Sequence, residues 1–227
     1  MASPRPCSLF IFDLDGTLID SSRDIALSIN LALSRLNFEP IPQARILEFV
    51  GEGVHKLVER ALREVTGGEP SPERTAAAVE LFLEAYEAHM LDSTRLVDGA
   101  LEALDGLAWG RFALVSNKPE RFSRRLLREL GIAGRFCAIL GGDSLPLRKP
   151  DPAPLLLAAE QCGAAPSDSV MVGDSAVDVI AGKAAGVFTC GIAGGFRGRE
   201  ELERAGCDLI ISGISELPRH FRPAPQE

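Results

Sequence analysis

Short apolar runs alternate along most of the chain with stretches in which apolar residues recur at helical spacing. Short apolar runs are typical of strands buried on both faces, and alternation with helices predicts a parallel sheet that helices cover on both sides. We therefore predict an α/β fold with a doubly wound parallel sheet. The expected strands are residues 8–13, 111–117, 136–142, 169–174, 187–193 and 208–212.

The first two expected strands are separated by about ninety residues, far more than one crossover helix needs. Apolar residues in this segment recur every three to four positions, as at Ile25, Ile29 and Leu33, which indicates amphipathic helices. The segment is therefore expected to form a helical cap domain, residues 19–93, inserted into an α/β core of residues 1–18 and 94–227. The expected helices are residues 20–38, 53–65 and 71–91, separated by stretches rich in proline and glycine.

Two local patterns concern the ends of elements. Ser21 followed by Asp24 predicts a capping box at the start of the first inserted helix. The final stretch, "RPAPQE" over residues 222–227, is expected to fray, as chain ends without an apolar anchor commonly do.

Composition and charge narrow the class of protein. The chain has 227 residues, of which 46% are hydrophobic, enough for a substantial core. Its net charge is −8, and its lysines, Lys56, Lys118, Lys149 and Lys183, are scattered. Because no basic block offers a footprint for a phosphate backbone, nucleic acid is not expected as a partner.

The cysteines and the chain start suggest a compartment. The cysteines are odd in number and dispersed, and no C-x-x-C pair occurs, which argues against a disulfide framework or a zinc site and fits a reducing cytosol. No apolar run approaches the roughly 18 residues that cross a bilayer, and "MASPRPCS" lacks a signal-peptide core. We expect a cytoplasmic protein with no membrane partner. The cysteines are Cys7, Cys137, Cys162, Cys190 and Cys207.

Polar residues follow several of the expected strands, at the sheet edge where ligands bind in open α/β folds. A lysine in the proline-stiffened loop "RKPDP" joins them. A parallel sheet would bring these distant segments together. The candidate residues are Asp13, Asp15, Ser116, Asn117, Lys149, Asp174 and Asp178.

Such a cluster suits a phosphate ester and a divalent cation. Several carboxylates crowd together only around cations, and hard oxygen ligands favour Mg²⁺. The Ser116 hydroxyl, the Asn117 N–H and a helix beginning near Pro119 would hold an anion together with Lys149. One carboxylate can attack phosphorus while another moves the proton of the leaving group. The side chain of Lys118 is expected to be solvated or to lie near the rim of the site.

Four motifs in this order resemble those of the haloacid dehalogenase superfamily: "DLDGT", "VSN", "KPDP" and "VGDSAVD". The likeness covers essentially the whole chain, including a helical cap after the first strand. Within the superfamily the chain most resembles the phosphoglycolate phosphatases, through "FDLDGTLIDSSRDIALSIN" and "VGEGVHKLVERAL".

The resemblance implies a role for each candidate. Asp13 is then the nucleophile and a magnesium ligand, and Asp15 is the general acid and base and lends its backbone carbonyl to the metal. Asp174 is a metal ligand, and Asp178 is a further ligand or a neighbour of the ligands. The phosphoryl group is bound by Ser116, Asn117 and Lys149.

The resemblance also implies a small anionic phosphorylated metabolite as substrate, with 2-phosphoglycolate as the leading candidate. Gly51, Glu52 and Gly53 stand at the head of a cap helix and are expected to help select it. A sugar phosphate, a nucleotide or pyrophosphate stays open as an alternative. A β-phosphoglucomutase is less favoured, because such enzymes carry Glu-Asp where this chain has Gly173-Asp174. A non-enzymatic binding module would be expected to lack Asp13 or Lys149.

Overall fold

The computed structural model describes residues 3–224. Its contacts divide the chain into a core unit, Met1–Ile19 with Leu96–Glu227, and a helical unit, Asp20–Arg95. The chain passes from one unit to the other within two short strands, β3 (Ile19–Asp20) and β4 (Arg95–Leu96), which pair with each other. The inserted segment was expected over residues 19–93, and the helical unit spans residues 20–95.

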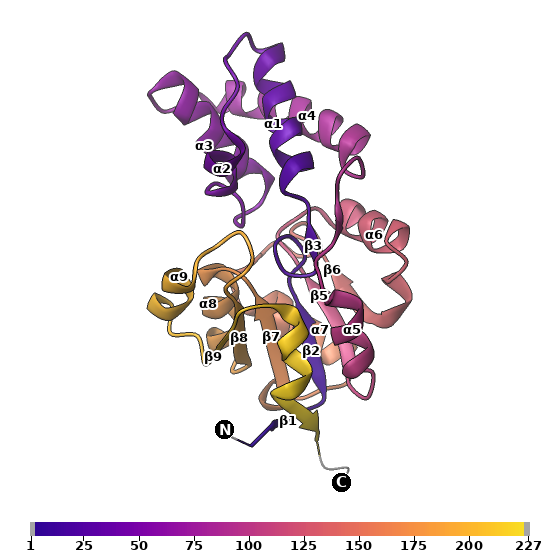
Figure 1. Cartoon of the computed structure of the whole chain (residues 1–227). Helices are drawn as coiled ribbons and strands as arrows, with labels where there is room; N and C mark the ends of the chain where they lie inside the picture. Colours follow the sequence, from indigo (N-terminus) through magenta and orange to yellow (C-terminus); the bar gives the residue numbers. More distant parts are fainter. Residues whose placement is uncertain (1–2, 225–227) are drawn as a thin grey trace. The chain divides into compact units, whose positions relative to one another are not determined.

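The core unit contains a six-stranded parallel sheet with strand order β6-β5-β2-β7-β8-β9 (Figure 1). Each of the six apolar runs forms a strand, and the prediction of an α/β fold with a parallel sheet is confirmed. The order of the sheet reverses beside β2, and this kind of position opens a crevice at the carboxyl ends of the strands. The strands are β2 (Leu9–Phe12), β5 (Arg111–Val115), β6 (Phe136–Leu140), β7 (Ser169–Gly173), β8 (Phe188–Ile192) and β9 (Leu209–Ile211).

Both faces of the sheet are buried, which explains why its strands are apolar without alternation. Leu9 and Ile11 of β2 belong to a cluster that includes residues of α7 (Ala153–Gln161) and α8 (Ala176–Ala184). Phe10 and Phe12, which point the other way along the pleat, contact the rings of Phe112 and other aromatic residues. The strand that carries the candidate aspartates is therefore held rigidly from both sides.

The remaining elements complete the core unit. A short parallel pair, β1 (Arg5–Cys7) with β10 (Phe221–Pro223), was not expected. The expectation that residues 222–227 fray is therefore wrong for Arg222 and Pro223, and residues 225–227 lie outside the described part. The other elements are α5 (Ala100–Gly106), α6 (Glu120–Glu129), α9 (Arg199–Arg204) and the short 3-10 helices Ala133–Arg135, Pro166–Asp168 and Ile214–Arg219.

The helical unit is built from α1 (Ser22–Arg35), α2 (Gln43–Leu47), α3 (Val54–Thr66) and α4 (Pro72–His89). Ile25, Ile29 and Leu33 lie on the buried side of α1, as their spacing predicts. Burial of this apolar stripe, rather than intrinsic propensity, supplies most of the stability of helices of this length.

The predicted capping box at the start of α1 is wrong. Ser21 occupies the N-cap position, and its side chain does not make the capping hydrogen bond. Asp24 is 1% exposed, and its Oδ2 accepts hydrogen bonds from Ser93 N (3.0 Å), Thr94 N (2.8 Å) and Thr94 Oγ1 (2.7 Å). A local sequence rule cannot anticipate these donors, because they lie about seventy residues away.

The expectation against disulfides is also wrong. Cys137 of β6 and Cys162, the C-cap residue of α7, form a disulfide with Cα atoms 5.7 Å apart. They meet because α7 packs against β6 and returns Cys162 to the strand. Cys7, Cys190 and Cys207 are free thiols.

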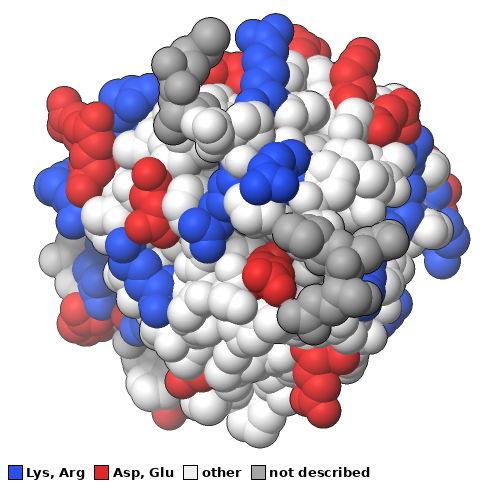
Figure 2. Space-filling view, turned by 90° about the horizontal axis from the view of Figure 1, so that it is seen from below, with Lys and Arg blue, Asp and Glu red and all other residues white. Residues whose placement is uncertain are grey.

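Charged residues are mixed on the face of the molecule seen in Figure 2, where basic and acidic side chains lie among each other. Such mixing does not produce the single-sign field that attracts a polyanion. Within residues 3–224, no helix has both the length and the apolar character that a membrane crossing requires.

Candidate functional site

The loop after β2 places two carboxylates at the carboxyl end of the sheet. The Asp13 N–H donates to the Val172 carbonyl (2.9 Å), so the strand pairing continues up to this residue. The Leu14 carbonyl then accepts from the N–H groups of Leu18 (3.0 Å) and Ile19 (3.1 Å), which closes a tight turn. The turn holds the Asp13 and Asp15 side chains on a short, fixed loop.

Three glycines allow the acidic groups to approach one another. Gly16 has φ +80°, and a Cβ there would overlap the carboxylate of Asp174. A Cβ at Gly173 would overlap the Asp178 carboxylate, and one at Gly195 would overlap Asp174 from the other side. Glycine is needed at these positions because the Cβ of any other residue would overlap the carboxylates.

Asp13, Asp174 and Asp178 form one cluster, with ligand oxygens that all lie within 4.8 Å of one another. Burial, opposed by the nearby Lys149 charge and reinforced by Asp178, raises the pKa of Asp13 to about 6. Burial, together with the charges of Asp178 and Asp13, raises the pKa of Asp174 well above its usual range. These carboxyl groups resist ionisation because they are buried and their negative charges repel one another. A bound cation would offset that repulsion.

Lys149 supplies one positive charge inside this cluster. Its Nζ donates to Asp13 Oδ1 (2.9 Å) and to Asp178 Oδ1 (2.6 Å), and the lysine is 2% exposed. Burial works most strongly against the ammonium charge, but the two carboxylates together outweigh it and raise the pKa of Lys149. Lys149 therefore stays positively charged beside Asp13.

Asp178 differs from the other two carboxylates. Its Oδ2 accepts from Ser175 N (3.2 Å) and Ser175 Oγ (2.7 Å), which forms the capping box of α8. With Lys149 on Oδ1, both of its oxygens accept hydrogen bonds. Among the described residues, by contrast, no donor contacts Asp13 Oδ2 or Asp174 Oδ1. Asp178 thus orients Lys149 and begins α8, while Asp13 and Asp174 each keep an oxygen for another ligand.

This donor set fits a divalent metal ion. The cluster offers hard carboxylate oxygens from two strand ends, and it is buried enough that the carboxylates need a counter-charge. Small divalent cations bind such sites through one or two carboxylates and complete their shell with water and substrate oxygens.

Ser116 and Asn117 follow β5 and are buried at the same end of the sheet. The Asn117 side chain donates through Nδ2 to the Lys149 carbonyl (2.8 Å), and so it fixes the loop that carries the lysine. The Ser116 hydroxyl accepts from the Lys118 N–H at 3.3 Å. The helix that follows, α6, has Pro119 at its N-cap.

Of the two alternatives expected for Lys118, the solvated one is wrong. Its side chain is 6% exposed, and its Nζ donates to Asp15 Oδ1 at 2.8 Å. Each aspartate of the first motif therefore has its own lysine, Asp13 with Lys149 and Asp15 with Lys118. The sequence signal that would have found Lys118 is its place two residues after Ser116, in the same strand-end loop.

A second contribution that the sequence did not reveal comes from the glycine-rich turn before α9. The N–H of Phe196 donates to Asp174 Oδ2 at 2.6 Å. This contact holds the carboxylate in place from the loop after β8, and Gly195 leaves room for it.

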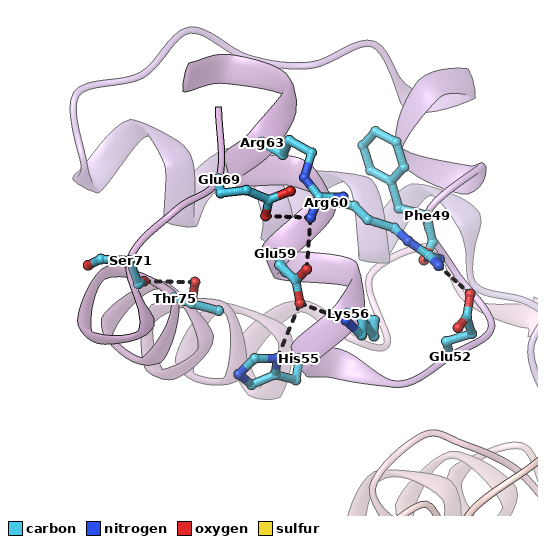
Figure 3. A network of polar contacts seen from close by, with 10 residues as sticks. All are labelled: Phe49, Glu52, His55, Lys56, Glu59, Arg60, Arg63, Glu69, Ser71 and Thr75. Carbon is cyan, nitrogen blue, oxygen red and sulfur yellow. Dashed lines mark hydrogen bonds and ion pairs between the residues drawn. The ribbon is translucent and has the colours of Figure 1, made fainter. Parts of the chain in front are cut away.

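In the helical unit, the loop of Gly51, Glu52 and Gly53 leads into α3 and is fixed by a network of charges (Figure 3). Glu52 forms an ion pair with Arg60, which also donates to the Phe49 carbonyl at 3.2 Å. The network continues along α3, where Glu59 contacts three basic side chains. They are His55, Lys56 and Arg63. The loop is therefore held to its own helix, and its part in substrate selection stays a prediction.

Comparison with known proteins extends over most of the chain. The sequence profile of the haloacid dehalogenase-like hydrolases matches residues 10–192. A phosphoglycolate phosphatase of Nitrosospira multiformis is 36% identical over 96% of this chain and 97% of its own length. One from Psychrobacter arcticus is 41% identical over 92% of this chain and 93% of its own length. The crystal structure of a predicted phosphoglycolate phosphatase from Haemophilus somnus superposes with a TM-score of 0.87 at 30% identity, over 93% of this chain and 96% of that chain.

Proposed function

The chain belongs to the haloacid dehalogenase-like hydrolases and is a phosphoric monoester hydrolase, and we propose that it hydrolyses 2-phosphoglycolate to glycolate and phosphate with the help of Mg²⁺. The observation that carries this proposal is the cluster in which Lys149 bridges Asp13 and Asp178 beside Asp174. The named relatives support the choice of substrate.

Asp13 is the nucleophile in this proposal. Its Oδ2 faces no hydrogen-bond donor among the described residues, while Oδ1 is held by Lys149, so one oxygen is oriented and the other is left to attack. Attack on phosphorus breaks the bond to the ester oxygen and leaves the phosphoryl group on Asp13 as an acyl phosphate. Lys149 offsets the repulsion between the aspartate and the phosphate dianion.

Asp15 moves the proton in both halves of the reaction. It protonates the departing oxygen of glycolate, then takes a proton from the water that attacks the phosphoryl-aspartate. This second step frees Asp13 and releases inorganic phosphate, so the protons balance over the cycle. Lys118 holds one oxygen of Asp15 in place.

Magnesium would be held by Asp13, Asp174 and the backbone carbonyl of Asp15, with Asp178 as their neighbour. When bound, the ion offsets negative charge on the phosphoryl oxygens and on the carboxylates. Ser116 and the N–H of Asn117 are the proposed partners of the remaining phosphoryl oxygens.

The test is phosphate release from a panel of phosphomonoesters, ranked by kcat/KM. We expect 2-phosphoglycolate to rank first, activity to stop with a chelator, and Mg²⁺ to restore it. Asp13→Asn should abolish release, whereas Asp105→Asn, which alters an exposed aspartate paired with Arg135, should not. A higher kcat/KM for a sugar phosphate, a nucleotide or pyrophosphate would contradict the substrate assignment. Near-normal kcat in Asp13→Asn would contradict the mechanism.

A further inference from the structure

We infer that Lys118 is a specificity-determining residue of the core unit, which binds the carboxylate of the leaving group of the substrate. This inference rests on the proposed function and deepens it, because it assigns recognition of the non-reacting end of 2-phosphoglycolate to a named ammonium group. It places part of the substrate selection outside the Gly51–Gly53 loop of the helical unit.

The first observation is the burial of Lys118. Lys56 and Lys183 are exposed, with side chains 52% and 44% exposed, as is usual for lysine. Lys118 and Lys149 are 8% and 2% exposed. A fold that buries an ammonium bears a desolvation cost. Lys149 has a clear use, since it neutralises Asp13 and Asp178, and the position of Lys118 suggests a comparable one.

The second observation is that the backbone of Lys118 is fixed on both sides. Its N–H donates to Ser116 Oγ (3.3 Å), and its carbonyl accepts from the Gly142 N–H (2.8 Å). Gly142 permits this contact, because a Cβ there would overlap the carbonyl of Asn117. The side chain therefore starts from a fixed backbone, and its contact with Asp15 already orders the ammonium group, so little side-chain entropy has to be lost on binding.

The third observation is the distance from the reacting atoms. Lys118 Nζ lies 2.8 Å from Asp15 Oδ1, and a general acid must come within about 2.6–3.2 Å of the oxygen it protonates. The ester oxygen of a bound substrate would then lie within roughly 6 Å of Nζ if both contact the same carboxylate oxygen. In 2-phosphoglycolate a single methylene separates that oxygen from the carboxylate, which brings the carboxylate within reach of Lys118.

Charge completes the argument. The leaving group of 2-phosphoglycolate carries a negative charge in addition to those of the phosphate, and it would enter a site that already contains Asp13, Asp15, Asp174 and Asp178. Lys149 is engaged by two of these carboxylates. Lys118 is a buried cation in contact with Asp15, the residue proposed to protonate the leaving group, so a carboxylate there gains a charge-assisted hydrogen bond.

The test compares two substrates that differ only in that charge, 2-phosphoglycolate and 2-phosphoglycolamide, by kcat/KM. The ratio is kcat/KM for 2-phosphoglycolate divided by kcat/KM for 2-phosphoglycolamide. Lys118→Met should lower this ratio by about 10–100-fold, the range for losing a hydrogen bond between charged groups. Any effect transmitted through Asp15 changes both substrates equally and cancels in the ratio. Lys118→Arg should restore part of the ratio, and Lys183→Met, which removes an exposed lysine of the same unit, should leave it unchanged.

The outcomes separate this inference from the proposed function. The wild-type protein could prefer 2-phosphoglycolate over its amide while Lys118→Met lowers kcat/KM for both by the same factor. Lys118 would then not be the residue that binds the carboxylate, although 2-phosphoglycolate would remain the substrate. Arg197 follows Phe196, whose N–H contacts Asp174, and loss of the preference in Arg197→Met instead would overturn the inference in the same way. If the wild-type protein shows no preference for the acid, both proposals fail. Lys118→Gln gives the same ratio test if the methionine variant does not fold.

Discussion

Asp13→Asn should make the protein more stable when no metal is bound, while it removes the activity. Burial raises the pKa of Asp13 to about 6, above the ordinary value of 3.8 for an aspartate in water. Between these two values the folded protein binds more protons than the unfolded chain, so stability falls as the pH rises through this interval. Asparagine resembles the protonated aspartate and should not bear this cost.

The size of the effect follows from the pKa. A shift of one unit corresponds to about 1.4 kcal/mol, so ionising Asp13 in the folded protein costs about 3 kcal/mol at pH 8 and about half as much at pH 5. For a chain of this size, about 3 kcal/mol corresponds to roughly 6–12 °C in Tm. The free energy of unfolding in urea, measured with a chelator at both pH values, checks the prediction, with Asp105→Asn as the control.

Two results would refute this reasoning. Equal stability of Asp13→Asn and wild type at pH 8 would mean that the buried carboxylate carries no net cost. A gain of the same size at pH 5 and pH 8 would mean that packing, rather than charge, is responsible. Added Mg²⁺ should stabilise the wild-type protein and stabilise Asp13→Asn much less, because a ligand that binds only the folded state shifts its stability.

The other predictions concern single residues. Gly173→Ala should lower kcat more than tenfold without a matching loss of fold by circular dichroism, because its Cβ would displace Asp178; unchanged kcat would contradict the placement of that carboxylate. Asp15→Asn should slow alkyl phosphates by about a hundredfold or more and aryl phosphates less, and equal slowing of both would argue against proton transfer. Glu52→Gln should change KM and substrate ranking more than kcat, and an unchanged ranking would place specificity elsewhere. Cys137→Ser should lower the free energy of unfolding by about 3 kcal/mol under non-reducing conditions, and a reductant should remove the difference.

The fold could be predicted from the sequence because it depends on patterns that are local and strong. Strands buried on both faces read as uninterrupted apolar runs, such as Leu9–Phe12, and the helices between them have clear periodicity. The β1–β10 pair could not be anticipated, because each strand has three residues and their pairing joins opposite ends of the chain. The Cys137–Cys162 disulfide likewise depends on how α7 returns to the sheet, which cysteine spacing does not reveal.

The sequence could predict that several candidate residues gather at one edge of the sheet, but not how they pair with one another. The topology of a parallel sheet brings Asp13, Ser116 and Asp174 to one edge, so strand ends alone identify them. Which lysine pairs with which aspartate depends on side-chain paths through the buried site, so the contact between Lys118 and Asp15 could not be predicted. The same limit applies to Phe196, whose contribution is a backbone N–H that any residue type could provide.

The adjacency of β3 and β4 has a consequence for how such proteins diversify. The inserted segment leaves and re-enters the core within two strands that pair with each other, so its two ends are already neighbours. A replacement segment of different length can be inserted there if its own termini lie close together. The sheet then bears no additional entropy cost of loop closure. The junction at Asp20 and Arg95 is thus a suitable place to exchange inserted domains between hydrolases.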